Sequence, residues 1–265
     1  MTAHLRAAFD NAAKQNRAAL VTYLTFGDPD PVTSIDVVEA VAKAGADVIE
    51  LGVPFSDPSA DGPSIQRAME RALLAGASLP GAIAAVAELR RRGVATPIVL
   101  FGYYNPIFVM GPATFAERAA RAGIDAVLTV DLPIDELAEL AKPLATYGVS
   151  VIPLVAPTST PDRIARLAEL DAPFVYYISL TGVTGSRSAA PVDPARIAQV
   201  RTASQSPVAV GFGIRTPDDA RRFAAVTDGV VVGTALVDRV ADGDAAGAPE
   251  RVASLVRDLA AAMTR

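Results

Sequence analysis

The chain has 265 residues, of which 51% are hydrophobic and 20% are charged, and its formal net charge is −5 at pH 7. This acidic balance disfavours a nucleic-acid partner, no apolar run approaches the roughly 20 residues that span a bilayer, and the absence of cysteine excludes disulfides and thiol nucleophiles. The N-terminus has no apolar core of a secretory signal, so we expect a cytoplasmic protein, and we place residues 1–265 in a single domain.

A polar N-terminal segment with helical periodicity opens the chain and contains His4, the single histidine, which we expect to be solvated. Short apolar, β-branched runs follow at regular intervals and predict eight strands, at 19–25, 47–51, 97–101, 125–130, 149–155, 174–179, 208–211 and 229–233. Helical periodicity between them predicts helices at 33–44, 79–92, 113–122, 134–147, 161–170, 194–202 and 216–225, with a last helix near 249–263.

Helix starts agree with this division of the chain. Thr160, Asp193 and Thr216 each precede a proline, which pairs an N-cap residue with a residue suited to the first helical turn. For the helix at 33–44, the capping role is expected of Thr33 or Ser34.

Strands that are apolar throughout are typical of a parallel sheet covered by helices on both faces. Eight strand–helix units in a chain of this length fit a closed barrel better than an open sheet. We therefore predict an α/β protein, a (β/α)8 TIM barrel with an additional N-terminal helix.

In such barrels the active site lies at the C-terminal ends of the strands. Glu50 ends the second apolar run, and the loop after it carries Asp61. Burial at the barrel mouth would raise the pKa of Glu50 and suit it to acid/base work, whereas hydrogen bonds from the polar loop around Asp61 would favour its ionised form. The alternative roles are structural: an ion pair or helix cap for Glu50, and a turn for Asp61.

Two glycine-containing segments follow the seventh and eighth strands, Gly211-Phe212-Gly213 and Gly233-Thr234. Loops at these positions frequently bind phosphate together with the N-terminus of a short extra helix, which we expect at 235–240. The alternative is that the glycines only permit tight turns.

The loop at 180–192 has the composition of a mobile lid or of an ordinary flexible loop, and Thr184 is its side chain best suited to contact a carboxylate. Aromatic residues at predicted strand ends could enclose a planar ligand or merely fill the core. They are Tyr23, Tyr103, Tyr176 and Phe212.

Several motifs in order along the chain resemble those of the tryptophan synthase α subunit family. They are TFGDPD at 25–30, ELGVPFSDPSADGP at 50–63, GYYNPIF at 102–108, YYISLTGVTGSR at 176–187, GFGI at 211–214 and VGTAL at 232–236. The resemblance implies a TIM-barrel lyase that cleaves indole-3-glycerol phosphate to indole and glyceraldehyde 3-phosphate.

By the same resemblance, Glu50 matches the general acid/base and Asp61 matches the aspartate that accepts the indole N–H. Thr184 matches the lid threonine that pairs with this aspartate. The indole pocket would be lined by Tyr23, Ile65, Tyr103 and Tyr176, and the phosphate would be surrounded by Gly185, Phe212, Gly213, Gly233 and Thr234.

The resemblance further implies a β-subunit partner in an α2β2 heterotetramer, with pyridoxal phosphate on the β subunit and neither a cofactor nor a metal on this chain. The implied contact surface comprises Pro54, Asp57, Asn105, Pro106 and Phe108. Two departures stand out: Thr234 replaces the more usual serine, and residues 186–192 match the family only loosely.

Three other interpretations stay open from the residues. A stand-alone indole-releasing lyase would need no partner, and a catalytically weak barrel would serve to bind and activate a β subunit. A phosphosugar isomerase would normally require a histidine or lysine at a strand end, which this chain lacks.

Overall fold

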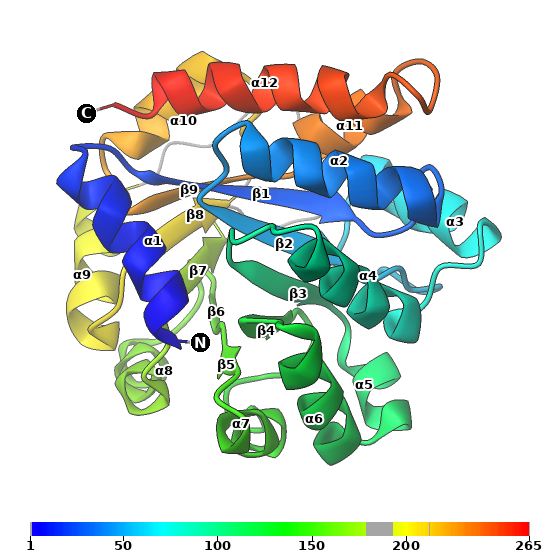
Figure 1. Cartoon of the computed structure of the whole chain (residues 1–265). Coiled ribbons are helices and arrows are strands. Elements are labelled where there is room, and N and C mark those ends of the chain that lie inside the picture. Colours follow the sequence, from blue (N-terminus) through cyan, green and yellow to red (C-terminus); the bar gives the residue numbers. More distant parts are fainter. Residues whose placement is uncertain (1, 179–192, 212, 265) are drawn as a thin grey trace.

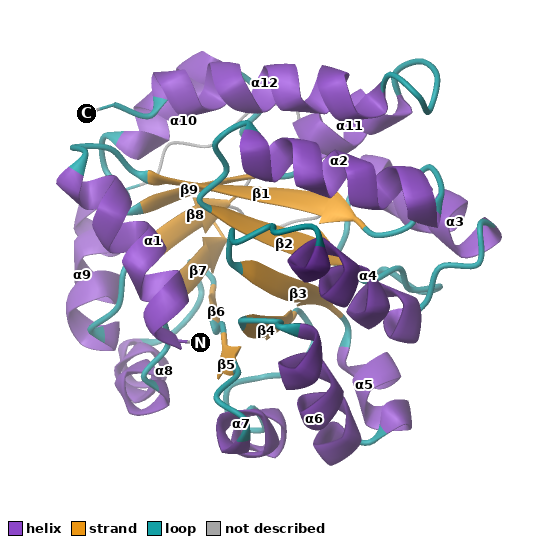
Figure 2. Cartoon of the chain, in the orientation of Figure 1, coloured by secondary structure: helices purple, strands orange, loops and turns teal. Residues whose placement is uncertain are grey.

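The computed structural model describes residues 2–178, 193–211 and 213–264 (Figure 1). Strands and helices alternate along the chain. The strands form a curled sheet, and the helices surround it (Figure 2). The strands are β1 Ala19–Thr25, β2 Val48–Gly52, β3 Ile98–Gly102, β4 Ala126–Thr129, β5 Ser150–Val151, β6 Leu154–Val155, β7 Val175–Ile178, β8 Val208–Gly211 and β9 Gly229–Val232. The helices are α1 Thr2–Lys14, α2 Pro31–Lys43, α3 Pro63–Leu74, α4 Leu79–Arg91, α5 Tyr104–Met110, α6 Pro112–Ala122, α7 Ala138–Thr146, α8 Pro161–Ala165, α9 Pro194–Ser204, α10 Pro217–Ala224, α11 Thr234–Ala241 and α12 Ala248–Ala262, and a 3₁₀ helix covers Arg166–Leu170.

All strand pairs are parallel, and the order in the sheet is β5-β4-β3-β2-β1-β9-β8-β7-β6. The two ends of this order, β5 and β6, are consecutive pieces of one segment. Ile152 N donates to Val127 O of β4 at 2.9 Å, and Tyr176 N of β7 donates to Pro153 O at 3.0 Å. Backbone hydrogen bonds thus close the sheet into a barrel, as predicted.

The prediction of a single strand at 149–155 is wrong in one respect, because Ile152 and Pro153 separate β5 from β6. Proline has no N–H to give to a ladder, so a strand is easily interrupted there. Two helices, α3 and α5, were not predicted from the sequence, and the helix expected at 134–147 begins only at Ala138. The short extra helix after the eighth predicted strand is confirmed as α11.

Three of the four expected N-caps are confirmed. The side chains of Thr160, Asp193 and Thr216 accept hydrogen bonds from first-turn amides of α8, α9 and α10. The fourth expectation is wrong: Asp30, not Thr33 or Ser34, caps α2 by accepting from the amides of Val32 and Thr33. The helix therefore begins at Pro31.

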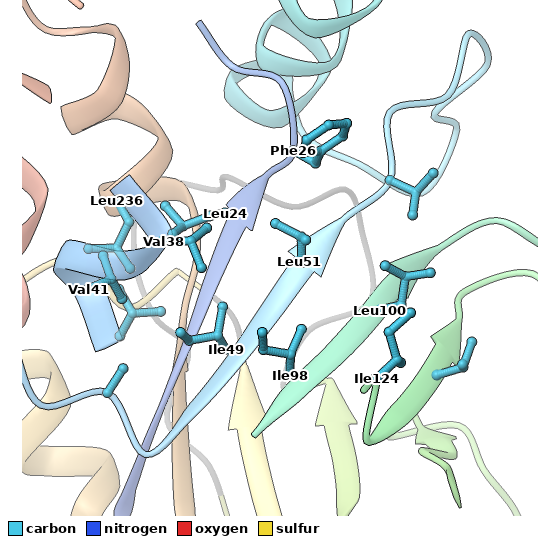
Figure 3. Packing of buried hydrophobic residues seen from close by; sticks show 14 of the residues in the cluster. Leu24, Phe26, Val38, Val41, Ile49, Leu51, Ile98, Leu100, Ile124 and Leu236 are labelled. Atoms are coloured by element: carbon cyan, nitrogen blue, oxygen red, sulfur yellow. The ribbon is translucent and has the colours of Figure 1, made fainter. Parts of the chain in front are cut away.

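Successive side chains of each strand point alternately to the surrounding helices and to the barrel interior. Ile49 and Leu51 of β2 belong to the large apolar cluster between the sheet and the surrounding helices (Figure 3). Because successive side chains of a strand point to opposite faces, Glu50 between them faces the barrel interior. Packing on the outside of the barrel thereby fixes where this carboxylate points.

Helix α1 lies across the N-terminal end of the barrel (Figure 1). Its Phe9 side chain is 3% exposed and contacts Phe174, with 5.0 Å between the ring centroids. Gly229 allows this approach, because a Cβ there would lie 2.8 Å from the Phe9 ring. Together with buried Leu5, these contacts close the end of the barrel opposite the C-terminal ends of the strands.

Three aspartates at the N-terminal end of the barrel repeat one arrangement. Asp47, Asp125 and Asp228 each precede a strand and accept the backbone N–H of a residue on the neighbouring strand, at 2.8, 2.8 and 2.9 Å respectively. Each also pairs with an arginine. His4 is exposed, as expected, and its Nδ1 also lies 3.0 Å from Oδ1 of buried Asp125.

Across the described residues, no single helix is long and apolar enough to cross a bilayer, and α3 and α4 pass this test only together, across a bend of 91°.

Candidate active site

Glu50 lies in the middle of β2, where its neighbours in the sheet are Tyr23 of β1 and Val99 of β3. Its side chain is 0% exposed, and neither carboxyl oxygen has a hydrogen-bond partner among the described residues. Burial without a compensating partner disfavours the charged form and raises the pKa of Glu50 to about 8. The group is therefore mostly protonated at neutral pH.

Asp61 reaches the same pocket from the loop between β2 and α3. Its Oδ2 accepts a hydrogen bond from the Tyr103 hydroxyl at 2.7 Å, and the same hydroxyl accepts from the Ala60 amide at 3.0 Å. Phe55 of this loop stacks on the Tyr103 ring with 4.9 Å between centroids. Tyr103, at the end of β3, thus holds both the backbone and the carboxylate of the loop.

The pKa of Asp61 is raised to about 6 because burial outweighs the hydrogen bond from Tyr103. This differs from the expectation that loop hydrogen bonds favour ionisation. Among the described residues, the side-chain donor to Asp61 is Tyr103, directly after β3, and its hydrogen bond only limits the rise of the pKa. Asp61 is still mostly ionised at pH 7, whereas Glu50 is mostly protonated. Their different environments therefore separate the two carboxyl groups into an acid and an anion.

Replacing Tyr103 by phenylalanine is expected to raise the pKa of Asp61 further, by about one unit, since a hydrogen bond to a charged group contributes about 1.5 kcal/mol. The ring and its stacking on Phe55 are preserved. Carbon-13 NMR titration of the side-chain carboxyls measures the change. Tyr147→Phe is a control, because Tyr147 is 45% exposed at the end of α7, and a Tyr103→Phe titration identical to that of the unsubstituted protein would contradict the assigned contact.

Aromatic rings form the walls of the pocket. Tyr23 is 3% exposed and packs edge-on against Phe101 with 5.2 Å between centroids. Two glycines make room for the tyrosines: a Cβ at Gly52 would lie 2.3 Å from the Tyr23 hydroxyl, and one at Gly211 would lie 2.1 Å from the Tyr176 hydroxyl. Burial raises the pKa of both Tyr23 and Tyr176, so both hydroxyls stay protonated.

The cavity that these groups enclose has a volume of about 50 Å³. The structure brings together in its lining eight of the residues expected from the sequence, and Tyr103 contacts the pocket through Asp61. Phe101, Ile214 and Val231 also line it and were not singled out, although their place at or beside the ends of predicted strands was a usable signal. The expected residues in the lining are Tyr23, Glu50, Asp61, Ile65, Tyr176, Gly213, Gly233 and Thr234.

Gly213, Gly233 and Thr234 meet at one side of this pocket. Gly213 has a φ of 68°, a conformation that favours glycine. Thr234 begins α11, is 8% exposed, and follows Gly233 at the helix N-cap. First-turn amides have no partner within their own helix, and the helix dipole favours an anion at this end. Thr184, Gly185 and Phe212 lie outside the described residues.

Comparison with known proteins was made on sequence and on structure. A sequence profile of the family described as tryptophan synthase alpha chain matches residues 9–264. The chain belongs to the tryptophan synthase alpha chain family.

Individual relatives agree with this assignment. The chain is 48% identical to the tryptophan synthase alpha chain of Nitrosococcus oceani over 92% of each chain, and 51% identical to that of Citrifermentans bemidjiense over 86% of each. Its fold is similar to a tryptophan synthase structure from Mycobacterium tuberculosis, with a TM-score of 0.90 and 39% identity over 98% of each chain. The subunit alpha structure from Legionella pneumophila strain Paris gives a TM-score of 0.88 at 33% identity, again over 98% of each chain.

Membership of this family confirms the resemblance drawn from the motifs, the TIM-barrel fold class and the expectation of a lyase of tryptophan biosynthesis. Alpha chains of the family are the subunit without a cofactor. Within the part of the chain that the structure describes, no cluster of three or more metal-binding side chains occurs.

Residues expected at the tryptophan synthase partner surface differ in their exposure. Asp57, Asn105 and Phe108 are exposed, and Pro106 is half-buried. Pro54 is buried, so its own side chain offers little surface. Val109 was not singled out from the sequence, yet it is 78% exposed beside Phe108, which is 60% exposed, on the unpredicted helix α5.

Proposed function

We propose that the chain cleaves indole-3-glycerol phosphate to indole and glyceraldehyde 3-phosphate by a retro-aldol reaction. The observation that carries this proposal is the pairing of a buried, mostly protonated Glu50 with a mostly ionised Asp61 in one aromatic-walled pocket. Family membership supplies the substrate class, and the pocket supplies an acid and an anion that can act on it.

In the proposed reaction, Glu50 donates its proton to the indole ring carbon that bears the glycerol phosphate chain. Positive charge develops on the ring nitrogen, and ionised Asp61 accepts the N–H and stabilises this charge. The bond between the ring carbon and the chain then breaks, and its electron pair restores the aromatic ring. The adjacent hydroxyl loses its proton and becomes the aldehyde of glyceraldehyde 3-phosphate, and Glu50, now a carboxylate, is available to receive that proton.

Binding roles follow from the placement of the other residues. Tyr23, Ile65, Tyr103 and Tyr176 would enclose the indole ring system, and the amides at Gly213, Gly233 and Thr234 would bind the phosphate at the start of α11. Thr184 would hold Asp61 on closure of the loop, while Gly185 and Phe212 would complete the phosphate site. The threonine at 234 keeps the hydroxyl that a serine would supply.

Family membership implies a β-subunit partner, and we propose that the complex is an α2β2 heterotetramer in the cytoplasm with pyridoxal phosphate on the β subunit. Asp57, Asn105, Pro106 and Phe108 would form the contact surface, with Pro54 supporting it from below. The exposed Phe108 and Val109 side chains support this placement, since adjacent exposed apolar residues often mark protein interfaces.

The test is indole release from indole-3-glycerol phosphate by the purified chain, alone and with a tryptophan synthase β subunit. Slow release that accelerates with the β subunit supports the proposal. Fast release that does not respond to the β subunit would instead support a stand-alone lyase. No release in either assay would overturn the proposed activity.

The pH dependence of kcat/KM in that assay is expected to be bell-shaped. Activity should rise as the pH increases through about 6, where Asp61 ionises, and fall as the pH increases through about 8, where Glu50 loses its proton. Tyr103→Phe should shift only the acidic limb of the profile, to higher pH, because it raises the pKa of Asp61. A kcat/KM that changes neither around pH 6 nor around pH 8 would contradict the assigned protonation states.

A further inference from the structure

A second cavity lies where the barrel wall is interrupted. β4 pairs with β5 only as far as Val127 and Val151, and β6 resumes at Leu154 on the side of β7. Beyond Val127, β4 stays paired with β3, but its other edge has no strand partner among the described residues. A cavity of about 340 Å³ occupies this position.

The walls of this cavity come from both sides of the sheet. Ile152 and Leu154 belong to the cluster inside the barrel, whereas Leu137, Ile164 and Leu167 belong to the cluster between strands and helices. The volume lies in the range of small-molecule sites, which are about 300–1,000 Å³ and mostly apolar with a few polar groups. The catalytic pocket, at about 50 Å³, is much smaller.

Among the described lining residues, the charged ones lie at the exposed rim of the cavity. Asp131 is exposed, and Arg163 is half-exposed and paired with Asp135 at 3.2 Å. Deeper in, Thr129 is 4% exposed, and its hydroxyl has no hydrogen-bond partner among the described residues. An occupant with one N–H could donate to this hydroxyl, whereas a phosphate would find no buried cation among the lining residues that the structure describes. The lining therefore favours a small, uncharged ligand with one polar group.

Two residues link this cavity to the surroundings of the catalytic pocket. Val130 lines the cavity and also packs against the apolar cluster that contains Tyr23, Ile65 and Tyr103. Leu154 lines the cavity and is the sheet neighbour of Tyr176, which lines the catalytic pocket.

We propose that this cavity, between the end of β4 and α8, is a second binding site that accepts uncharged fused-ring aromatic molecules, and that indole itself is its ligand. The choice of indole rests on the proposed function. Of the substrate and the two products, only indole lacks a phosphate and carries a single ring N–H. A molecule released into the catalytic pocket would thus find an apolar site nearby, beyond the neighbouring residues Tyr176 and Leu154.

Equilibrium dialysis with radiolabelled indole tests the proposal on the full chain. Indole-3-propanol phosphate is added at saturation to occupy the catalytic pocket, and its own binding is measured separately. The unsubstituted chain is expected to bind about one further indole, because the phosphate excludes the analogue from the apolar cavity.

Two variants that reduce the cavity, Leu132→Phe and Ile134→Phe, are expected to weaken this indole binding by about tenfold or more. Both residues line the cavity and are half-buried, so the larger ring is tolerated at either position. Leu74→Phe is the matched control, since Leu74 is 84% exposed at the end of α3 and should leave indole binding unchanged. Thermal unfolding of each variant verifies that it is folded.

Anomalous diffraction from crystals soaked in 5-bromoindole supplies the position. A bromine peak between Leu137 and Ile164 supports the proposal. A peak only in the catalytic pocket, no indole binding beside the analogue, or unchanged binding in both folded variants would overturn it. Failure of the analogue to bind, or of the chain to cleave its substrate, would count against the proposed function, while the effect of Leu132→Phe on indole binding would still test the cavity.

Discussion

Replacement of Glu50 by glutamine is expected to reduce the rate of indole-3-glycerol phosphate cleavage by about 10²–10⁴-fold, the range typical of a lost general acid/base. Glutamine has nearly the same shape, so the packing of β2 against β1 and β3 is preserved, but the side chain can no longer transfer a proton. The measurement is kcat for indole release with the β subunit present, together with binding of indole-3-propanol phosphate to verify that the pocket is intact.

Glu117→Gln provides a control for this substitution. Glu117 lies on α6, is 40% exposed and pairs with Arg121 of the same helix, so the change should leave kcat unaltered. Most of the activity surviving in Glu50→Gln would exclude Glu50 as the acid. Loss of both activity and analogue binding would instead indicate a damaged pocket. The urea unfolding measurements described below would show whether the variant is still folded.

The same substitution is expected to alter how the free energy of unfolding depends on pH. Glu50 has a pKa of about 8 in the folded chain and 4.5 as its ordinary value. Between these values the native state binds more protons than the unfolded state, so stability falls as the pH rises. From pH 6 to pH 8 this group should cost the unsubstituted chain about 2 kcal/mol, and Glu50→Gln should be free of that loss.

Urea unfolding at pH 6 and pH 8 measures the difference. Asp61 contributes little over this range because its pKa is about 6, and its contribution is common to both proteins. Glu117→Gln should lose as much stability as the unsubstituted chain. Equal losses in Glu50→Gln and the unsubstituted chain would show that Glu50 ionises without penalty, and would remove the basis for its role as a proton donor at neutral pH.

Both expectations arise from one arrangement. A carboxyl group is buried in the barrel without a hydrogen-bond partner among the described residues, at a cost in stability that increases with pH. At the opposite end of the barrel, Asp47, Asp125 and Asp228 each accept a backbone amide and pair with an arginine. The N-terminal end thus stabilises the sheet, while the C-terminal end holds the groups that act on a substrate.

The sequence alone determined the barrel and the identity of its two carboxylates. Alternating apolar strands and amphipathic helices are local patterns, and eight such units predict the (β/α)8 fold. Because Glu50 stands between the apolar residues Ile49 and Leu51 of one strand, period-two alternation directs it into the barrel. Motif spacing was sufficient to identify the family, which the comparisons confirm.

Only the tertiary structure decided the environment of those groups. The hydroxyl of Tyr103 reaches Asp61 from 42 residues away, and His4 contacts Asp125 across 121 residues. The break at Pro153 leaves a cavity because α8 and the segment before α7 do not fill the space beside β4. Hydrogen bonds, desolvation and cavities depend on which distant side chains meet, and a local pattern of residue types does not specify that.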